Sequence, residues 1–231
     1  MATMHSSVLA RLGPRIVDGR LPTGSVLTLE RIGEEFGVSR TVAREVVQVL
    51  VSMRLVSSRR RTGITVLPQG EWDMYDPAVI RWRLAGPARS TALRQLTQLR
   101  SAVEPPAAAL AARNADAHQR RRVAELAVLL ESTGAEGDLR TFLEYDVDFH
   151  RLLLAASANA MFAGLAEVVE TVLRGRTDLD LMPPRPKAEA RRLHAVVAEA
   201  VTGGEPEVAR AAMSAICAEV GTEMERLVTQ K

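Results

Sequence analysis

The sequence predicts a mainly α-helical protein in two parts: a small N-terminal part that ends in β-strands, and a C-terminal all-α antiparallel helical bundle. The chain has 231 residues, which suits two domains better than one. Strand-like stretches are confined to residues 55–67, and a polar linker bounded by prolines follows them. The longer segments have apolar residues at helical spacing. We therefore expect a first domain over 1–68, a linker and connecting helix over 69–87, and a second domain over 88–231.

Turn and capping residues divide the first domain into three helices and two strands. Residues 19–24 are rich in glycine and proline and predict a turn. Thr28 and Ser39 are suitable N-caps, because their hydroxyl groups accept a hydrogen bond from the first turn of a helix. The expected helices are 6–18, 29–36 and 40–53, and the expected strands are 55–57 and 63–67.

Residues 29–46 fit the packing pattern of a helix-turn-helix. Counted from Leu29, the fifth position must be small where the two helices cross, and it is Gly33. The ninth position needs a left-handed turn, and it is Gly37. With the two strands after it, this segment predicts a winged helix-turn-helix, a fold that binds duplex DNA. The apolar positions of the pattern are filled by Ile32, Phe36, Val38, Ala43 and Val46.

The second helix of this motif carries DNA-binding groups on its outer face. Its apolar residues face inward, which leaves Ser39, Arg40, Thr41 and Arg44 outside at the N-terminal end. That end of a recognition helix reaches the base edges. Arginine binds guanine through two hydrogen bonds, and hydroxyl groups bind phosphate. We expect these four residues to contact DNA.

Charge and composition agree with a double-stranded DNA partner. Residues 1–67 hold ten arginines against five acids, whereas the rest of the chain is net acidic by three charges. Eight aromatic residues are too few for stacking on single-stranded nucleic acid. No apolar run is long enough to span a membrane, no signal region begins the chain, and the single cysteine, Cys217, suits a reducing compartment. We expect a cytoplasmic protein with no membrane partner.

The second domain is expected to be a bundle of six or seven helices with a pocket among them. Glycine, asparagine and proline residues separate its helices. Pro105 and Pro106 predict a kink or a split in the first long helix. We expect Arg120–Arg122 to lie on a solvated helix face. The expected helices are 78–85, 90–115, 116–130, 139–158, 161–176, 188–201 and 205–228.

The segment Gly37-Val-Ser-Arg-Thr-Val-Ala-Arg-Glu45, with Leu50 and Leu55-Val56 after it, resembles the GntR family of bacterial transcription regulators. The helical body resembles the ligand-sensing FCD domain of the FadR subfamily, so the resemblance covers nearly the whole chain. It implies that the helix residues named above and the wing residue Gly63 contact operator DNA. Because such operators are two-fold symmetric, it also implies a homodimer. Many members have arginine where this chain has Glu30, which implies a different operator sequence.

Three side chains of the body form a candidate metal site. Asp146 and His150 are four residues apart, hence on one face of a helix, and His194 follows on a later helix. A carboxylate with two imidazoles binds divalent metals. Asp146-Val-Asp-Phe-His150 resembles the Asp-x-x-Phe-His motif of the family, and His194 matches the first of its two later histidines. The second is replaced by Ile216, so one usual ligand is missing.

Two interpretations of this site stay open. A divalent metal, zinc first among the candidates, is bound weakly by three protein ligands, and water and the effector complete its shell. Alternatively no metal binds, and the three side chains hydrogen-bond the effector directly.

The effector is expected to be a small organic acid, bound by arginine together with the three side chains of the candidate metal site. Arg100 resembles the pocket arginine of the family, and Arg174 is a second candidate; a guanidinium group suits a carboxylate. Trp72, the segment 76–84 and Ile216 resemble the sugar-acid branch of the family, the galactonate-operon repressors and their neighbours. This resemblance implies that a sugar acid controls operator binding.

These observations predict a transcription regulator and not an enzyme. The resemblance implies a repressor that its effector releases from DNA. The alternative is a metal-dependent enzyme with a site of two histidines and one carboxylate, fused to a DNA-binding domain. No nucleophile elbow, phosphate-binding loop or HExxH motif supports that alternative. A third possibility, an architectural DNA-binding protein, would not need the polar residues of the body.

Overall fold

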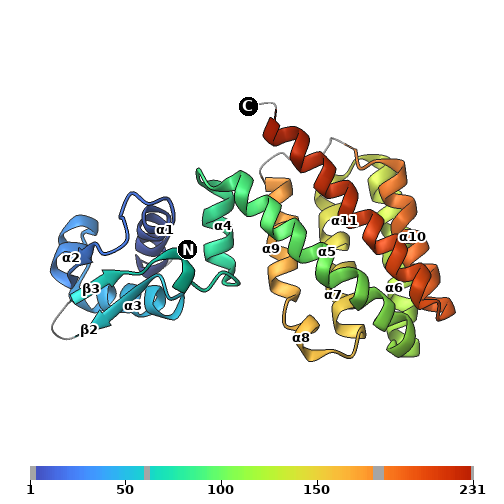
Figure 1. The fold of residues 1–231 in the computed structure, drawn as a ribbon, viewed down its shortest axis with the longest axis horizontal. Coiled ribbons are helices and arrows are strands. Elements are labelled where there is room, and N and C mark those ends of the chain that lie inside the picture. The colour runs from blue at the N-terminus through green and yellow to red at the C-terminus, as the bar shows by residue number, and fades with distance from the viewer. Residues whose placement is uncertain (1–3, 60–62, 179–184, 230–231) are drawn as a thin grey trace. The chain divides into compact units, whose positions relative to one another are not determined.

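The structure is a computed structural model that describes residues 4–59, 63–178 and 185–229 (Figure 1). The chain divides into two compact units, residues 1–89 and 90–231, each with its own core. This division lies two residues from the boundary expected between 87 and 88. The fold class is confirmed: helices and a small sheet form the first unit, and the second is helical throughout its described part.

The first unit has a three-stranded antiparallel sheet in the order β1-β3-β2 beside its helices. Strand β1 was not expected, because two residues are too few for an alternation pattern; it pairs Val26 with Thr65 of β3. Residues 60–62, at the tip expected for the wing, lie outside the described part of the chain. The elements are α1 (Met4–Val17), β1 (Val26–Leu27), α2 (Leu29–Phe36), α3 (Arg40–Ser52), β2 (Val56–Arg59), β3 (Gly63–Val66), the 3-10 helix η1 (Gln69–Glu71) and α4 (Pro77–Ala85).

Local interactions fix the turn between α2 and α3. The hydroxyl group of Thr28 accepts a hydrogen bond from the backbone of Arg31, and that of Ser39 accepts one from Val42, so both expected caps are confirmed. Gly37 has a φ of 65°, the left-handed conformation that the turn requires. A Cβ atom on Gly33 would lie 3.0 Å from the carbonyl oxygen of Val38, which explains the small residue at the crossing.

The second unit consists of packed helices, of which α5 runs without interruption through Pro105 and Pro106 (Figure 1). The alternative of a split helix is therefore wrong. The expected helix 161–176 is instead two helices, with Gly164 and Leu165 between them. The elements are α5 (Arg89–Asn114), α6 (Ala117–Glu136), α7 (Leu139–Ala156), α8 (Ala160–Ala163), α9 (Ala166–Asp178), α10 (Ala188–Gly203) and α11 (Pro206–Thr229).

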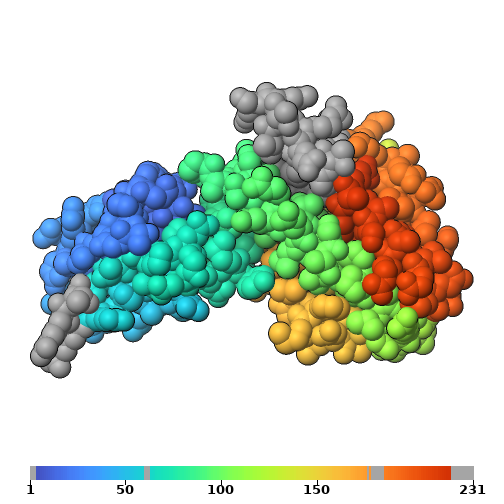
Figure 2. Space-filling model, in the orientation of Figure 1, coloured from blue at the N-terminus to red at the C-terminus, as the bar shows by residue number. Residues whose placement is uncertain are grey.

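Small side chains let α5 pack closely against its neighbours. Five alanines between residues 107 and 112 are buried, and the core around them contains side chains of α6, α7, α10 and α11. Figure 2 shows that both α5 (green) and α11 (red) also reach the surface of the unit. Residues 182–184 of the expected break before α10 are not among the described residues. None of the described helices is long and apolar enough to cross a membrane.

Candidate functional site

The first candidate site is the N-terminal end of α3. Ser39, Arg40, Thr41 and Arg44 are all exposed on this end of the helix, as expected. Nη2 of Arg40 lies 3.2 Å from Oε1 of Glu30, the residue at which the chain departs from the family pattern. A carboxylate therefore stands beside the first arginine of the expected DNA-binding face, and DNA phosphate would compete with it for this guanidinium.

Gly63 begins strand β3 with a φ of 76°, a conformation that glycine adopts without strain. A Cβ atom there would lie 3.1 Å from the side chain of Val26 and 3.4 Å from the carbonyl oxygen of Leu27. The backbone conformation and the close packing at the base of the wing therefore favour glycine at this position, in addition to the DNA contact that the resemblance implies.

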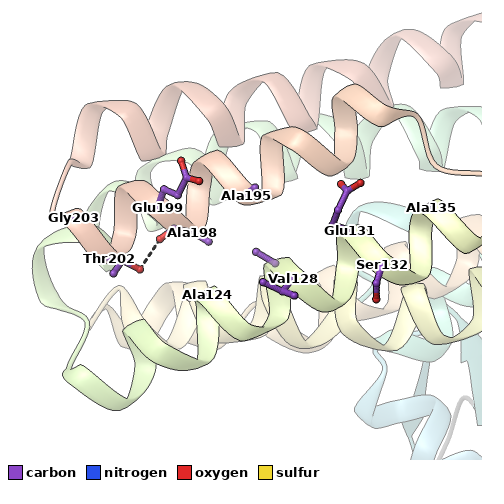
Figure 3. Close-up of a pocket in the computed structure, with 11 residues that line it drawn as sticks. Ala124, Val128, Glu131, Ser132, Ala135, Ala195, Ala198, Glu199, Thr202 and Gly203 are labelled. Atoms are coloured by element: carbon purple, nitrogen blue, oxygen red, sulfur yellow. Dashed lines mark hydrogen bonds between the residues drawn. The ribbon is translucent and has the colours of Figure 1, made fainter.

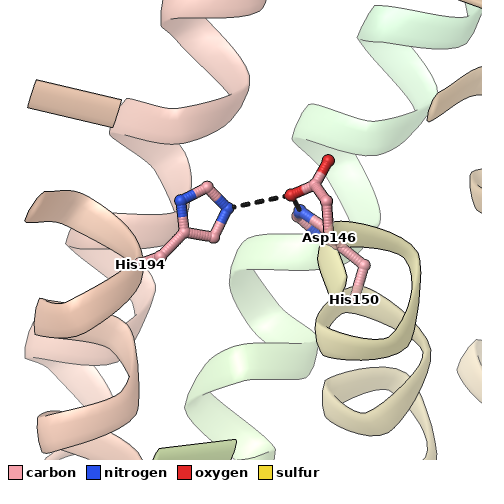
Figure 4. A group of neighbouring side chains, drawn as sticks. All are labelled: Asp146, His150 and His194. Carbon is pink, nitrogen blue, oxygen red and sulfur yellow. Dashed lines mark hydrogen bonds and ion pairs between the residues drawn. The ribbon is translucent and has the colours of Figure 1, made fainter. Parts of the chain in front are cut away.

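The second candidate site is a buried polar cluster in the second unit. Asp146 and His150 lie on α7, one helical turn apart, and His194 comes from α10 (Figure 4). One ligand atom from each of the three lies within 4.8 Å of the other two. Nε2 of His194 is 3.1 Å from Oδ1 of Asp146, and Nε2 of His150 is 3.5 Å from the same oxygen. The structure brings together the three residues of the predicted metal set.

The orientation of His194 fits a metal ligand. Its Nδ1 is 2.7 Å from the carbonyl oxygen of Ala190, and because a carbonyl group only accepts, Nδ1 carries the proton. In the neutral ring Nε2 is then a lone-pair atom that faces a carboxylate oxygen of Asp146. A cation, either a proton or a metal ion, must lie between two such atoms. A histidine fixed by a backbone carbonyl through its far nitrogen is typical of metal ligands.

The other two members of the set also fit. Among the described residues, Nε2 of His150 is fully buried and makes no hydrogen bond, as expected of an atom whose partner is a ligand. Burial raises the pKa of Asp146, but the two histidines beside it lower it more, so the carboxylate is ionised. Phe149, fully buried, packs edge-on against both imidazole rings and closes one side of the site.

Arg100 and Glu104, on α5, extend the cluster. Both side chains are 2% exposed. Nε of Arg100 donates to Oε1 of Glu104 at 2.5 Å, and Nη2 donates to Oε2 at 3.2 Å. Oε2 of Glu104 lies 2.5 Å from Nδ1 of His150, an ion-pair contact too poorly directed to count as a hydrogen bond. Nη1 of Arg100 is buried and has no hydrogen-bond partner among the described residues.

In the metal-free protein the carboxylate of Glu104 lies between two positively charged groups, those of Arg100 and His150. Burial raises its pKa, but the attraction of Arg100 and then of His150 lowers it to about 2. Burial lowers the pKa of His150, while the attraction of the carboxylates of Glu104 and Asp146 raises it to about 9. Glu104 was not among the site residues expected from the sequence. A signal was present, because Glu104 follows Arg100 by four residues and so shares its helix face.

Arg174 lies on α9 in a different environment. Its Nη1 and Nη2 donate to Glu144 at 2.6 and 2.8 Å, and its Nε donates to Glu170 at 2.8 Å. About a third of its side chain is exposed. The structure thus places Arg174 in a surface ion-pair network and does not bring it together with Arg100. Ile216, on α11, is buried in the core of the unit.

A large open groove in the second unit lies between α6 and α10 (Figure 3). Its volume is about 850 Å³, and alanines, Val128 and other small residues line most of it. The charged residues in its lining are Glu131 and Glu199, so it offers no cation to an acid. None of its lining residues belongs to the buried cluster, and we do not assign the effector to it.

Two family models match the chain. The model of the FCD domain matches residues 95–219, and the model of bacterial regulatory proteins of the gntR family matches residues 5–66. The chain belongs to the GntR family. It is a transcriptional regulator with an FCD ligand-binding domain, and the enzyme alternative is not supported.

Curated relatives of this GntR regulator include two proteins from Escherichia coli K12. An uncharacterized HTH-type transcriptional regulator, YieP, is 32% identical over 72% of this chain and 74% of its own length. The galactonate operon transcriptional repressor is 29% identical over 72% of each chain. A probable D-xylose utilization operon transcriptional repressor from Paenarthrobacter nicotinovorans is 26% identical over 92% of this chain and 84% of its own length.

Solved structures of lower identity share the fold. The Lar regulator, which controls the agr system of Listeria monocytogenes, has a TM-score of 0.66 at 18% identity and covers 98% of this chain and 99% of its own. McbR/YncC of E. coli has a TM-score of 0.55 at 19% identity and covers 99% of this chain and 100% of its own. At these identities the likeness concerns the fold alone.

Proposed function

We propose that this GntR regulator is a homodimeric repressor whose operator affinity is controlled by a small carboxylate, a sugar acid, bound in the FCD domain. The observation that carries the proposal is the buried cluster, which combines an unsatisfied guanidinium nitrogen of Arg100 with the donor set of Asp146, His150 and His194. A carboxylate satisfies the first, and hydroxyl groups suit the second. The galactonate repressor among the relatives supports the sugar-acid class.

We propose further that a divalent ion, zinc by its preference for two imidazoles and a carboxylate, occupies the cluster. Asp146, His150 and His194 would hold it, and it would supply a Lewis-acidic centre that binds oxygen atoms of the effector. With Ile216 in place of a fourth ligand, coordination positions stay open for those atoms. The competing interpretation, in which the three side chains bind the effector without a metal, remains an outcome of the test.

The exposed end of α3 is proposed to bind the operator through Ser39, Arg40, Thr41 and Arg44, with Gly63 at the wing. Effector binding changes DNA affinity only if the effector binds the free and the DNA-bound conformations unequally. For a catabolic repressor we expect the effector to favour the free form and release the DNA.

The test uses the full chain and an operator selected from a randomised duplex pool. Fluorescence anisotropy follows operator binding while sugar acids are titrated, with and without a chelator. We expect one acid to weaken binding, and its lactone and amide to have no effect, because they leave Arg100 without an anionic partner. Loss of the response in chelator supports the metal; an unchanged response supports direct binding.

The variant for this test is Arg100→Lys. It keeps a positive charge beside Glu104 but lacks the second terminal nitrogen, whereas Arg100→Ala would leave a buried carboxylate unpaired. We expect Arg100→Lys to bind operator normally and to lose most of the response. If no acid changes operator affinity in the wild-type protein, the sensing proposal is wrong.

A further inference from the structure

Glu104 contacts both Arg100, the proposed anion-binding residue of the buried cluster, and His150, one of its proposed metal ligands. It is on α5, one helical turn after Arg100, and its carboxylate contacts side chains of two helices. One oxygen accepts from Nε of Arg100, and the other accepts from Nη2 of Arg100 and contacts Nδ1 of His150 on α7. Neither the sequence pattern nor the proposed function gives this residue a role.

We propose that Glu104 is a positioning residue that fixes the anion-binding arginine and a metal-ligating histidine against each other. The inference rests on the proposed function, since it takes His150 as a metal ligand and Arg100 as the group that receives the effector. Each contact of Glu104 has one consequence, the first for Arg100 and the second for His150.

The first consequence concerns Arg100. Its Nε and Nη2 donors are occupied by Glu104, so the edge that pairs with a carboxylate through two parallel hydrogen bonds is already in use. Nη1 is the nitrogen left without a partner among the described residues. Glu104 thus holds the guanidinium plane in place and leaves a single nitrogen for the effector.

The second consequence concerns His150. The negative charge of the Glu104 carboxylate, 2.5 Å from Nδ1, favours the neutral tautomer with its proton on Nδ1, which leaves Nε2 as the ligand atom. A carboxylate behind an imidazole also makes the ring a better donor to a metal ion. Nε2 faces Asp146, the side on which the third ligand, His194, lies.

Glutamine cannot take over this role. Its amide group has one acceptor oxygen and one NH₂ group, so in Glu104→Gln either Arg100 or His150 faces a donor. The chain offers a matched control in Glu144, whose carboxylate binds Arg174 through two hydrogen bonds of 2.6 and 2.8 Å at the surface. It lies two residues before Asp146, about 200° around α7 from it. Glu144→Gln therefore removes the same charge from a similar ion pair.

The experiment measures metal affinity of the full-length protein after chelator treatment. Co²⁺ is titrated and followed by its visible absorption, and Zn²⁺ affinity is measured by competition. We expect Glu104→Gln to weaken both affinities about ten- to hundredfold, the effect of removing a second partner of a ligating histidine. We also expect the Co²⁺ spectrum to change. Glu144→Gln should match the wild type in both respects. Thermal unfolding without metal checks that both variants are folded.

A second variant guards against a folding defect. Arg100→Met combined with Glu104→Leu removes the buried ion pair as a whole, which leaves no unpaired charge in the core. It should fold and bind metal as weakly as Glu104→Gln. If the wild type binds metal and both Glu104 variants bind it equally well, this inference is wrong and the proposed metal site stands. If the wild type binds neither ion, both are wrong.

Discussion

Arg120 gives the sharpest stability prediction, because a side chain expected on a solvated face holds two helix ends together. Its Nε and Nη2 donate to the carbonyl oxygens of Ala115 and Ala112 at the end of α5, each at 3.0 Å. Its Nη1 donates to the carbonyl oxygens of Val201 at 2.5 Å and Thr202 at 2.8 Å, in the last turn of α10. The expectation of a solvated face was therefore wrong for this residue.

The perturbation is Arg120→Met, which keeps the length of the stem and removes all four hydrogen bonds. The last carbonyl groups of a helix have no partner within the helix, so Arg120 supplies what α5 and α10 lack at their ends. A charged hydrogen bond contributes about 1.5–3 kcal/mol when removed singly. Water replaces part of this at a partly buried site, and effects at one residue do not add, so we expect a total loss of about 2–4 kcal/mol.

The assay is thermal and urea unfolding of the full chain. For a protein of this size the loss corresponds to a fall in Tm of roughly 5–15 °C. The control is Arg121→Met, the adjacent residue, which is exposed and for which the described part of the chain shows no hydrogen bond or ion pair. Its effect should stay within about 0.5 kcal/mol. Equal stability of the two variants would refute the helix-end reasoning.

Three further predictions concern the DNA face, the metal set and the surface network. Arg44→Ala should weaken operator binding by about 1–3 kcal/mol and relax base preference, as measured by anisotropy against single-base operator variants. Ile216→His should tighten Zn²⁺ binding if it supplies the missing ligand, which competition titration decides. Arg174→Met should cost about 1 kcal/mol at pH 7 in urea unfolding. Arg174 lowers the pKa of Glu144 and Glu170, and stability from a lowered carboxyl pKa disappears as pH falls, so this cost should shrink below about pH 4.

The helix-turn-helix was predictable in detail because its constraints are local. Gly33 and Gly37 are required by a close crossing and a left-handed turn within ten residues of each other, and Thr28 and Ser39 cap the helices that follow them. Each of these signals needs only the neighbouring sequence. Strand β1 was missed for the opposite reason, since two residues form a strand here only because β3 lies beside them.

The helices of the second unit were predictable from periodicity, and their interruptions were less so. Pro105 and Pro106 remove two backbone donors, which normally favours a break. Yet α5 continues, with Pro105 and the alanines after it buried in the core, so tertiary packing outweighs the local cost. Conversely, a single glycine within an apolar stretch did not predict a helix end at Gly164, but the short helix α8 ends there.

The buried polar cluster of the second unit depends on contacts that no local pattern contains. The spacing of Asp146 and His150 placed two groups on one helix face, but His194 comes from 44 residues beyond His150, and the family resemblance was needed to join it to them. Arg174 and Arg100 are both arginines with a glutamate four residues away, in opposite chain directions. One pair is buried beside a histidine, and the other lies at the surface. Burial separates a candidate site residue from a surface ion pair, and burial is set by the packing of whole helices.

Glu104 follows from the same reasoning. The spacing of four residues from Arg100 places Glu104 on the same helix face, but it does not show that the side chain is buried, since most glutamates are exposed. In the folded chain it is a buried carboxylate, and a buried carboxylate is stable only with its opposite charges beside it. Arg100 and His150 are those charges. The need to stabilise Glu104 in the core therefore ties the position of Arg100, the proposed effector-binding residue, to that of His150, the proposed metal ligand. A change at either of the two should be felt at the other.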